Sequence, residues 1–310
     1  MRVLFLGTPV FAVPSLQILI ENSYEVCGVF TQPDRPAGRG NNLQPSPVKM
    51  LAETHGLPVL QPEKLNTEET RVIMESLNPD IIVTAAYGQI IPGWMLRYSK
   101  FFPVNVHASL LPKYRGAAPI ARAILNGDTV AGVTTMVMEE SLDAGGMLLR
   151  EEIPVPIEVT TGELTALLAA IGARLLLRTL EGLRDNTLIP EPQDESLVTW
   201  APRITKDHAA VDWKKPALAI HNQIRAMNPW PAAHTGFRDE KISLWRSLPL
   251  QSEGGAPPGT ILGTVTNALS VQCGEGTILG ILEAQRPGKK RINGREFASG
   301  ARLQPGERLQ

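Results

Sequence analysis

The sequence predicts an α/β domain, with a mostly parallel sheet and helices on both faces, followed by a small β-barrel. Three observations predict this fold class. Through roughly the first 185 residues, short apolar runs alternate with helix-length segments, which is typical of successive βαβ units. Pro and charged residues then accumulate, as they do in a linker. Beyond them, short β-like runs alternate with Gly, Pro and Asn turns, a pattern typical of small barrels.

Length and composition fit an ordinary soluble protein of two domains. At 310 residues the chain suits about two domains, which we place at residues 1–188 and 206–310, with a linker at 189–205. It is 43% hydrophobic and 20% charged, with a net charge of −1. Apolar runs stay well short of ~18 residues, and the first one is too short for a signal peptide. We therefore expect no membrane segment and a cytoplasmic location.

The two cysteines, Cys27 and Cys273, lie far apart in apolar, strand-like runs. This placement fits buried thiols in a reducing compartment better than a disulfide framework. No spacing typical of metal ligands occurs, so we expect no metal.

The first domain begins as a βαβ unit, with a strand at residues 3–6, a helix at 14–21 and a strand at 24–31. A right-handed crossover then gives a parallel sheet. The GxGxxG fingerprint is missing after the first strand, which argues against a bound dinucleotide. The last two strands are joined by a short acidic turn, so we expect an antiparallel pair and a mixed sheet. Further strands are expected at 58–60, 80–86, 102–107, 132–138 and 147–153, and helices at 47–55, 66–77, 116–126 and 160–185.

A long connection at residues 32–45 is expected to lack secondary structure. Loops of this length are usually functional or disordered. Arg35 and Arg39 lie in it among glycines and prolines, and they could make planar, charge-assisted contacts with phosphate. A solvated loop without a function remains the alternative.

The second domain is expected to hold one amphipathic helix at 217–227 and a barrel. Residues 200–310 carry 15 Lys and Arg against 9 Asp and Glu, and the rest of the chain has a net charge of −7. Small basic barrels often bind oligonucleotides, but a structural or dimerising barrel remains an alternative. Strands are expected at 242–245, 259–262, 269–272 and 277–282.

Candidate catalytic residues lie in the stretch 102–116, where a strand runs into a loop. Asn105 and His107 share one face of this strand at its carboxyl end, the end at which open α/β sheets bind ligands. An amide and an imidazole together could hold a carbonyl oxygen as it becomes negative, and could move a proton. The alternative is that both side chains only satisfy nearby backbone groups.

A third candidate is Asp143, in the acidic turn between the last two strands. If its carboxylate meets His107, it would orient the imidazole and favour the protonated ring. We find no Ser or Cys in a nucleophile elbow, so we expect direct attack of one substrate on the other. Tyr87 and Gly88 follow another strand and are expected at the same edge of the sheet.

These residues resemble a known family. Asn-Val-His-Ala-Ser-Leu-Leu-Pro at 105–112, with Arg-Gly-Ala-Ala-Pro at 115–119, closely resembles the signature of the folate-dependent formyltransferases, and 142–145 resembles their acidic loop. The resemblance extends from Met1 past Gly300. Stretches at 32–40, 224–231 and 288–290 are similar to those members whose acceptor is initiator methionyl-tRNA.

The resemblance implies a formyl transfer from 10-formyltetrahydrofolate to the methionine amine of that tRNA, giving N-formylmethionyl-tRNA. It implies a Rossmann-like first domain that binds folate. It also implies a C-terminal barrel of oligonucleotide-binding type. We expect a monomer. The residues implied are Asn105, His107 and Asp143 for catalysis; Ser109, Leu110, Leu111, Pro112, Tyr87 and Gly88 for folate; and Arg35, Arg39, Lys206, Lys289 and Lys290 for tRNA.

Three departures from the family pattern are visible. Ala108 replaces a common Gly, which would crowd the folate slightly. Gly146 replaces a frequent second acid after the catalytic Asp. Asn41 and Asn42 replace frequent lysines, so the loop would rely less on charge.

Two other functions stay open at this point. A formyltransferase for a small amine would be active without the second domain and would not bind tRNA. A non-catalytic nucleic-acid-binding protein would leave Asn105, His107 and Asp143 unexplained together.

Overall fold

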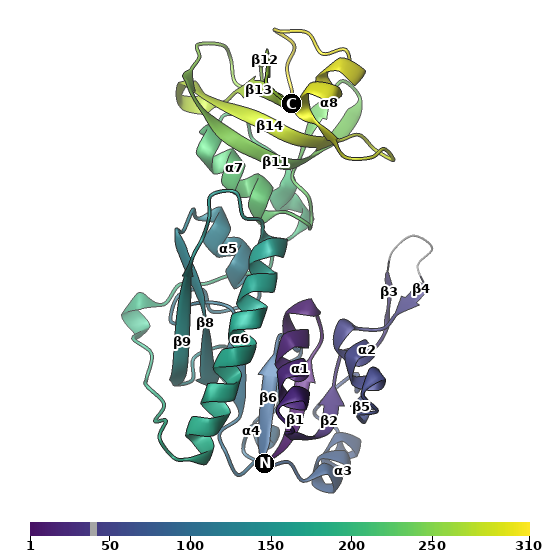
Figure 1. Ribbon diagram of the computed structural model, residues 1–310, viewed down its shortest axis with the longest axis vertical. Coiled ribbons are helices and arrows are strands. Elements are labelled where there is room, and N and C mark those ends of the chain that lie inside the picture. Colours follow the sequence, from purple (N-terminus) through teal and green to yellow (C-terminus); the bar gives the residue numbers. More distant parts are fainter. Residues whose placement is uncertain (38–41) are drawn as a thin grey trace. The chain divides into compact units, whose positions relative to one another are not determined.

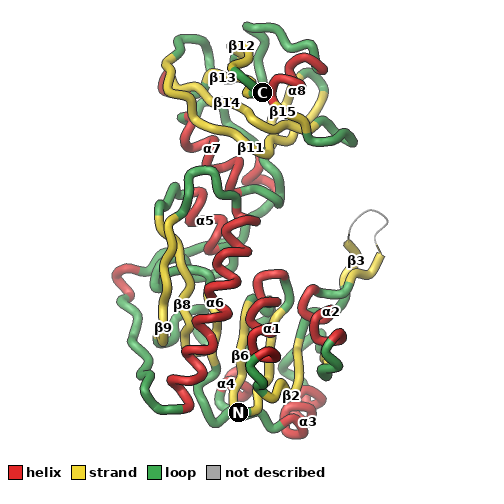
Figure 2. Tube along the Cα trace, in the orientation of Figure 1, coloured by secondary structure: helices red, strands yellow, loops and turns green. Residues whose placement is uncertain are grey.

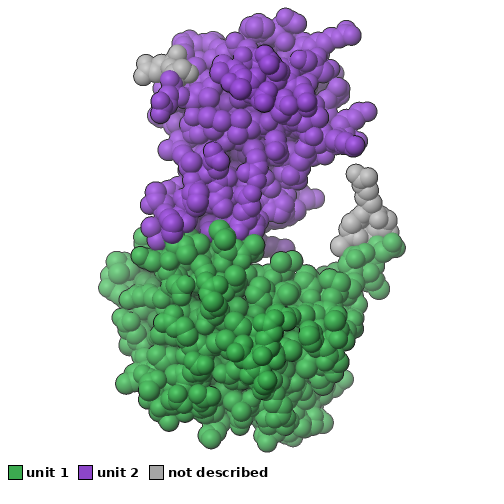
Figure 3. Space-filling view, in the orientation of Figure 1, with its two compact units in different colours: residues 1–116, 131–153, 165–201 green, residues 117–130, 154–164, 202–310 purple. Residues whose placement is uncertain are grey.

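The structure is a computed structural model that describes residues 1–37 and 42–310, and its chain divides into two compact units (Figure 3). Unit 1 holds residues 1–116, 131–153 and 165–201, and unit 2 holds 117–130, 154–164 and 202–310. The two units interleave along the chain, so a single cut does not separate them. The domain boundaries at 188 and 206 therefore stay a prediction.

The core of unit 1 is a seven-stranded sheet in the order β5-β2-β1-β6-β7-β8-β9 (Figure 1). The pairs from β5 to β7 are parallel, whereas β7 and β8 are antiparallel. The predicted mixed, mostly parallel sheet is confirmed. The strands are β1 (Arg2–Gly7), β2 (Glu25–Phe30), β5 (Val59–Leu60), β6 (Ile81–Ala85), β7 (Val104–His107), β8 (Val130–Val137) and β9 (Met147–Pro154).

Figure 2 shows the helices between these strands in red, and two of them, α2 (Pro47–Thr54) and α3 (Glu68–Leu77), begin after residues whose side chains cap them. The Ser46 hydroxyl accepts the Lys49 N–H, and the Thr67 hydroxyl accepts the Thr70 N–H, which satisfies a first-turn donor in each helix. One four-residue helix, α4, was not predicted because it is too short to show a 3.6-residue period. The helices are η1 (Val10–Ala12), α1 (Val13–Glu21), α2 (Pro47–Thr54), α3 (Glu68–Leu77), α4 (Gly93–Leu96), α5 (Pro119–Leu125) and α6 (Thr161–Arg184).

The long connection after β2 contains secondary structure, so its prediction as a plain loop was wrong. β3 (Arg35–Ala37) and β4 (Asn42–Gln44) pair antiparallel. Each strand has three residues, which is too few to show an alternating apolar pattern. Arg39 and the other residues of 38–41 lie outside the described residues.

Unit 2 contains α7 (Ala217–Ala226) and an antiparallel sheet in the order β10-β11-β14-β13-β12, with β15 paired to β14. The predicted C-terminal β domain is confirmed, and its sheet is antiparallel. Register shifts along the 14-residue strand β11 mark bulges, which bend a strand. The remaining elements are β10 (His234–Phe237), β11 (Glu240–Glu253), β12 (Ile261–Val265), β13 (Ala268–Gln272), β14 (Thr277–Gln285), β15 (Ile292–Asn293), α8 (Gly294–Gly300), η2 (Glu195–Leu197, in unit 1), η3 (Lys206–Ala209) and η4 (Gly274–Gly276).

The last residues of the chain join the two edges of this sheet. Leu309 donates its backbone N–H to the Gly259 carbonyl at 2.9 Å, next to β12. Gln310 exchanges two backbone hydrogen bonds of 2.8 Å with Gly236 of β10. The C-terminal segment thereby closes the sheet, which removes two exposed strand edges.

Both cysteines are free and buried, as predicted. Cys273 lies in unit 2, where burial raises the pKa of its thiol to about 12. A thiol in such surroundings is not a nucleophile near neutral pH. Across residues 1–37 and 42–310, no helix combines the length and the apolar character needed to cross a membrane.

Candidate active site

The site is built on β7, which places Asn105 and His107 on one face of the sheet. Val104 and Val106 on the other face are buried. A Cβ added to Gly172 of α6 would lie 2.7 Å from Val106 Cγ1, so this helix packs closely against the strand. Helix α6 thus packs against the apolar face of β7, and the polar side chains of β7 lie on the opposite face, at the carboxyl ends of the parallel strands.

His107 is 6% exposed and is oriented by a backbone carbonyl. Its Nε2 lies 3.0 Å from the carbonyl oxygen of Tyr114, so Nε2 carries the proton of the neutral ring. Its Nδ1 faces Asp143 Oδ2 at 3.7 Å. A protonated ring would therefore donate from Nε2 to the carbonyl and present Nδ1–H toward the carboxylate.

Asp143 reaches this position from the turn between β8 and β9. Its backbone has φ +50°, a left-handed conformation that is uncommon for residues other than glycine. Its Oδ2 accepts the Gly116 N–H at 2.8 Å, and within the described part of the chain its Oδ1 has no hydrogen-bond partner. The structure brings the carboxylate and the imidazole together, as the sequence predicted; their catalytic roles remain proposals.

Asn105 is partly exposed and lies beside Thr84 of β6 and Met136 of β8 in the sheet register. Within residues 1–37 and 42–310, no group accepts a hydrogen bond from its amide. Two N–H donors are therefore available at the sheet edge, two residues before His107. A site that stabilises a developing oxyanion needs donors of this kind.

The segment predicted to contact folate, Ser109–Pro112, is fixed by β8. The Thr134 hydroxyl donates to the Ser109 carbonyl at 2.7 Å and accepts the Leu111 N–H at 3.1 Å. The Ser109 hydroxyl donates to the Lys113 carbonyl at 2.6 Å. Sequence reasoning missed Thr134, because one threonine in an apolar strand carries no spacing signal.

Tyr87 and Gly88 form a turn at the end of β6. The Tyr87 carbonyl accepts the Thr8 hydroxyl at 2.8 Å, and Gly88 has φ +89°, which favours glycine. The Tyr87 side chain is 2% exposed, and burial raises the pKa of its phenol. Any contact from Tyr87 to a ligand at this edge would therefore come from its backbone.

The residues predicted to bind tRNA are exposed where the structure describes them. Arg35 begins β3 in unit 1. Lys206 begins η3, and Lys289 and Lys290 lie in the turn between β14 and β15, all in unit 2. Arg39 falls outside the described residues. These tRNA contacts stay predictions.

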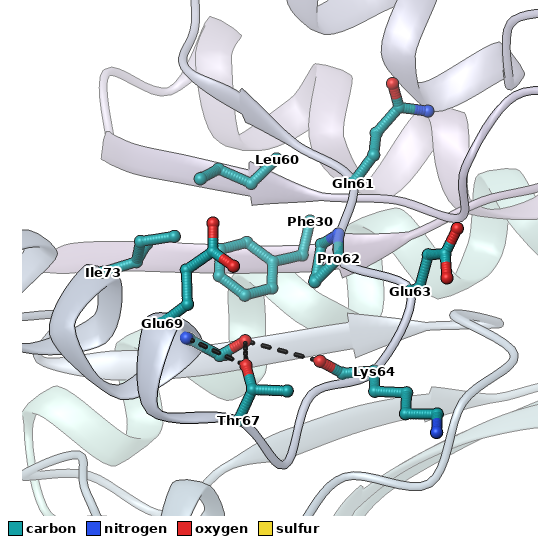
Figure 4. Close-up of a pocket in the computed structure, with 10 residues that line it drawn as sticks. Phe30, Leu60, Gln61, Pro62, Glu63, Lys64, Thr67, Glu69 and Ile73 are labelled. Atoms are coloured by element: carbon teal, nitrogen blue, oxygen red, sulfur yellow. Dashed lines mark hydrogen bonds between the residues drawn. The ribbon is translucent and has the colours of Figure 1, made fainter.

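A pocket of about 550 Å³ lies elsewhere in unit 1, beside β5 and the start of α3 (Figure 4). Phe30, Leu60 and Ile73 form its apolar wall, and Thr67 bonds Thr70 near its rim. None of the residues predicted for the site lines it. We therefore locate the candidate site at the carboxyl ends of β6 and β7 and not in this pocket.

Comparison with known proteins decides the family. A formyl transferase family model matches residues 1–180, and one for the formyl transferase C-terminal domain matches residues 203–302. The methionyl-tRNA formyltransferase of Bacillus velezensis is 46% identical over 308 residues, which cover 99% of this chain and 97% of the relative. That of Methylococcus capsulatus is 47% identical over 309 residues, 100% and 99% of the two chains.

The chain belongs to the methionyl-tRNA formyltransferase family. The resemblance carried by residues 105–119 and by the stretches at 32–40, 224–231 and 288–290 is thereby confirmed.

Solved structures share the family's fold at lower identity. An N-formyltransferase from Helicobacter canadensis, determined with folinic acid and dTDP-3-aminofucose, has a TM-score of 0.67 at 20% identity and covers 92% of this chain and 99% of its own. The methionyl-tRNA formyltransferase from Clostridium thermocellum has a TM-score of 0.57 at 14% identity, covering 95% and 100%. These two likenesses concern the fold alone.

Proposed function

We propose that this chain transfers the formyl group of 10-formyltetrahydrofolate to the α-amino group of methionine on initiator methionyl-tRNA. The observation that carries the proposal is the convergence of an amide, an imidazole and a carboxylate at one sheet edge. His107 Nδ1 and Asp143 Oδ2 lie 3.7 Å apart there, and Asn105 lies two residues before the imidazole on the same strand face. Family membership supports the substrates.

The residues at this edge fit a formyl donor. The donor's carbonyl oxygen needs hydrogen-bond donors, and the Asn105 amide has free N–H groups within the described residues. The backbone at 109–111 is already held by Thr134, and the turn at 86–88 by Thr8. Ligand contacts from such fixed backbone need little reorganisation on binding. We infer that these two segments hold the folate.

Each catalytic side chain has one role in the proposed reaction. 10-Formyltetrahydrofolate supplies the carbonyl carbon that the neutral methionine amine attacks. The donors to the oxygen as it gains charge are the Asn105 amide and the Nδ1–H of a protonated His107, because Nδ1 lies 3.7 Å from Asp143 Oδ2, beyond hydrogen-bond distance. Asp143, directly or through a water, accepts the proton that the amine loses, and the departing folate nitrogen takes up a proton. A C–N bond forms and another breaks, and nothing is oxidised or reduced.

For the acceptor, we propose that Arg35, Arg39, Lys206, Lys289 and Lys290 contact the tRNA. The basic balance of residues 200–310 supports a surface that neutralises phosphates. We further propose that the enzyme acts as a monomer in the cytoplasm. Light scattering of the purified protein tests the monomer; a stable dimer would contradict it.

The experiment that tests this function is incubation of the full chain with initiator methionyl-tRNA and 10-formyltetrahydrofolate, scored for formylmethionine after hydrolysis of the ester bond. Free methionine and a small amino sugar serve as matched alternative acceptors. We expect formylation of the tRNA only. Formylation of a small amine with no reaction on tRNA would overturn the proposal in favour of the small-amine formyltransferase.

A further inference from the structure

The segment at residues 187–201, which the sequence predicted to fall mostly in a linker, belongs to unit 1 and is hydrogen-bonded to other parts of that unit along its length; we call it the strap. Glu191 exchanges two backbone hydrogen bonds with Met147, at 2.7 and 2.8 Å. Further along, Arg115 donates its backbone N–H to Thr199 and accepts one from Ala201, at 2.9 and 2.8 Å. The strap is thus attached beside the start of β9 and beside the loop after β7.

Gln193 lies between these two attachments and is 9% exposed. Its Nε2 donates to the backbone carbonyls of Asp143 and Gly145, each at 2.8 Å. Its Oε1 accepts the Arg115 Nε–H at 3.0 Å. Both N–H groups of the Gln193 amide therefore bind the turn that carries Asp143, and its oxygen binds the buried Arg115 side chain.

Arg115 extends this network to the surface. It is 3% exposed, and its two terminal nitrogens bind the two Glu195 carboxylate oxygens at 2.7 and 3.2 Å. A paired guanidinium of this kind is fixed in orientation as well as in charge. Its neighbour Gly116 donates its N–H to the Asp143 carboxylate, so the same short segment holds the aspartate by its side chain and, through Gln193, by its backbone.

The turn that carries Asp143 is closely packed against β8 at Gly145 and against the strap at Gly146. A Cβ added to Gly145 would lie 2.0 Å from the Val137 carbonyl oxygen, and one added to Gly146 would lie 2.7 Å from Pro190 Cβ. Neither position accepts a side chain unless a neighbour moves. Gly146, which replaces a frequent acid of the family pattern, therefore lies where the strap packs directly against the turn.

We propose that Gln193 is a positioning residue for formyl transfer, which holds Asp143 in its left-handed backbone conformation so that the carboxylate faces His107. The proposal rests on the proposed function for its kinetic consequences. Arg115 and Glu195 act one step further away, by fixing the Gln193 amide so that both of its N–H groups face the turn.

The test compares Gln193→Met, which keeps the length and loses all three hydrogen bonds, with Gln193→Glu, which keeps an oxygen for Arg115 and loses both donors. Ile189→Ala, a strap residue that is 85% exposed, is the matched control. We expect both Gln193 variants to lower kcat about 10- to 100-fold, with KM for both substrates within about threefold. Ile189→Ala should behave as wild type.

A double-mutant cycle separates positioning from general destabilisation. In an Asp143→Asn background, Gln193→Met should lower kcat by less than about twofold, because the residue it positions no longer acts. A full additive loss would show that Gln193 acts elsewhere and would overturn the proposal.

A measurement independent of catalysis keeps the test decisive. Hydrogen exchange of residues 141–146 should become at least about tenfold faster in Gln193→Met than in wild type, while the sheet core of unit 1 exchanges unchanged. If wild type fails to formylate methionyl-tRNA, the proposed function fails, and the exchange experiment still tests the positioning. Unchanged exchange in the turn, or unchanged kcat in an active enzyme, would overturn the proposal.

Discussion

At the scale of the residue, the site depends on how a few polar groups are paired and which are left free. His107 is committed on Nε2 to a carbonyl and faces a carboxylate on Nδ1. Asp143 is committed on Oδ2 to a backbone N–H and leaves Oδ1 open within the described residues. In each side chain one atom is therefore held by a hydrogen bond, and the other, Nδ1 of His107 or Oδ1 of Asp143, can face the substrate. Such an orientation suits proton transfer to or from a bound substrate.

Asn105→Ala tests the oxyanion role at this scale. Removing one such donor should lower kcat by roughly 10²–10³ with little change in KM, because the hydrogen bond strengthens as the carbonyl oxygen gains charge. Steady-state kinetics with initiator methionyl-tRNA measure it, and an unchanged melting temperature serves as the control for folding. A turnover within about threefold of wild type would remove Asn105 from the mechanism.

Some residues of the candidate site could be predicted from the sequence and others could not. Asn105, His107 and Asp143 could be singled out because an amide and an imidazole share a strand face and an acid lies in a glycine-containing turn. Gln193 and Thr134 could not, because each acts through backbone atoms about 23 to 50 positions away along the chain. A single polar residue that bonds distant carbonyls leaves no periodicity or spacing to detect.

At the scale of the element, the β3–β4 hairpin shows how a short motif is anchored from outside. Asp34, just before β3, accepts hydrogen bonds of 2.7 Å from Lys49 Nζ of α2 and from Gln61 Nε2. Gln61 also donates to the Gln32 carbonyl at 2.8 Å. The sequence predicted a functional connection here but not its strands, since pairing of three-residue strands depends on these distant contacts.

Lys49→Met should weaken the hairpin base, because Asp34 loses its cationic partner. We expect KM for the tRNA to rise about three- to tenfold, with KM for the folate unchanged, because the hairpin begins at Arg35, which we propose contacts the tRNA, and a loosened hairpin costs ordering entropy on binding. Lys100→Met, a lysine that lies outside the hairpin base, is the control. An equal rise in KM for the folate would contradict a role confined to the hairpin.

The same contact predicts a pH dependence of stability. Hydrogen bonds from Lys49 and then Gln61 hold the pKa of the Asp34 carboxyl below its ordinary value. A lowered pKa in the folded state contributes stability above the ordinary value of about 4, and this is lost as pH falls through the folded-state value. Melting temperatures of wild type should exceed those of Asp34→Asn at pH 7, and the gap should shrink as pH falls below the ordinary carboxyl pKa and close below the folded-state pKa of Asp34. A gap that persists at low pH would contradict this.

At the scale of the whole molecule, the sequence predicted the fold class and the family but not how the chain is divided. Apolar runs and helical periods predicted the strands of the mixed sheet, and short runs between turns predicted a C-terminal part built of β-strands. The interleaving of the units could not be predicted, because residues 117–130 and 154–164 read as ordinary parts of the first domain yet belong to unit 2. Local patterns do not encode which distant segment an element packs against.

The excess of basic residues in the C-terminal part of the chain predicts that tRNA binding depends on salt concentration. Lys289→Ala together with Lys290→Ala should lower the slope of log affinity for tRNA against log salt by about 1 to 2, because each phosphate contact releases a counterion. Filter binding at several salt concentrations measures the slope, and Lys214→Ala with Lys215→Ala, an exposed pair elsewhere in unit 2, is the control. An unchanged slope would remove the β14–β15 turn from tRNA binding.

The most direct test of the account is the single-turnover rate of formyl transfer by Asp143→Asn, measured with saturating initiator methionyl-tRNA and 10-formyltetrahydrofolate. The amide keeps an oxygen for the Gly116 N–H but cannot accept a proton or face His107 with a charge. We predict a rate at least about 100-fold below wild type with a normal melting temperature. A rate within about threefold of wild type would contradict the claim that the three side chains act together on one carbonyl group.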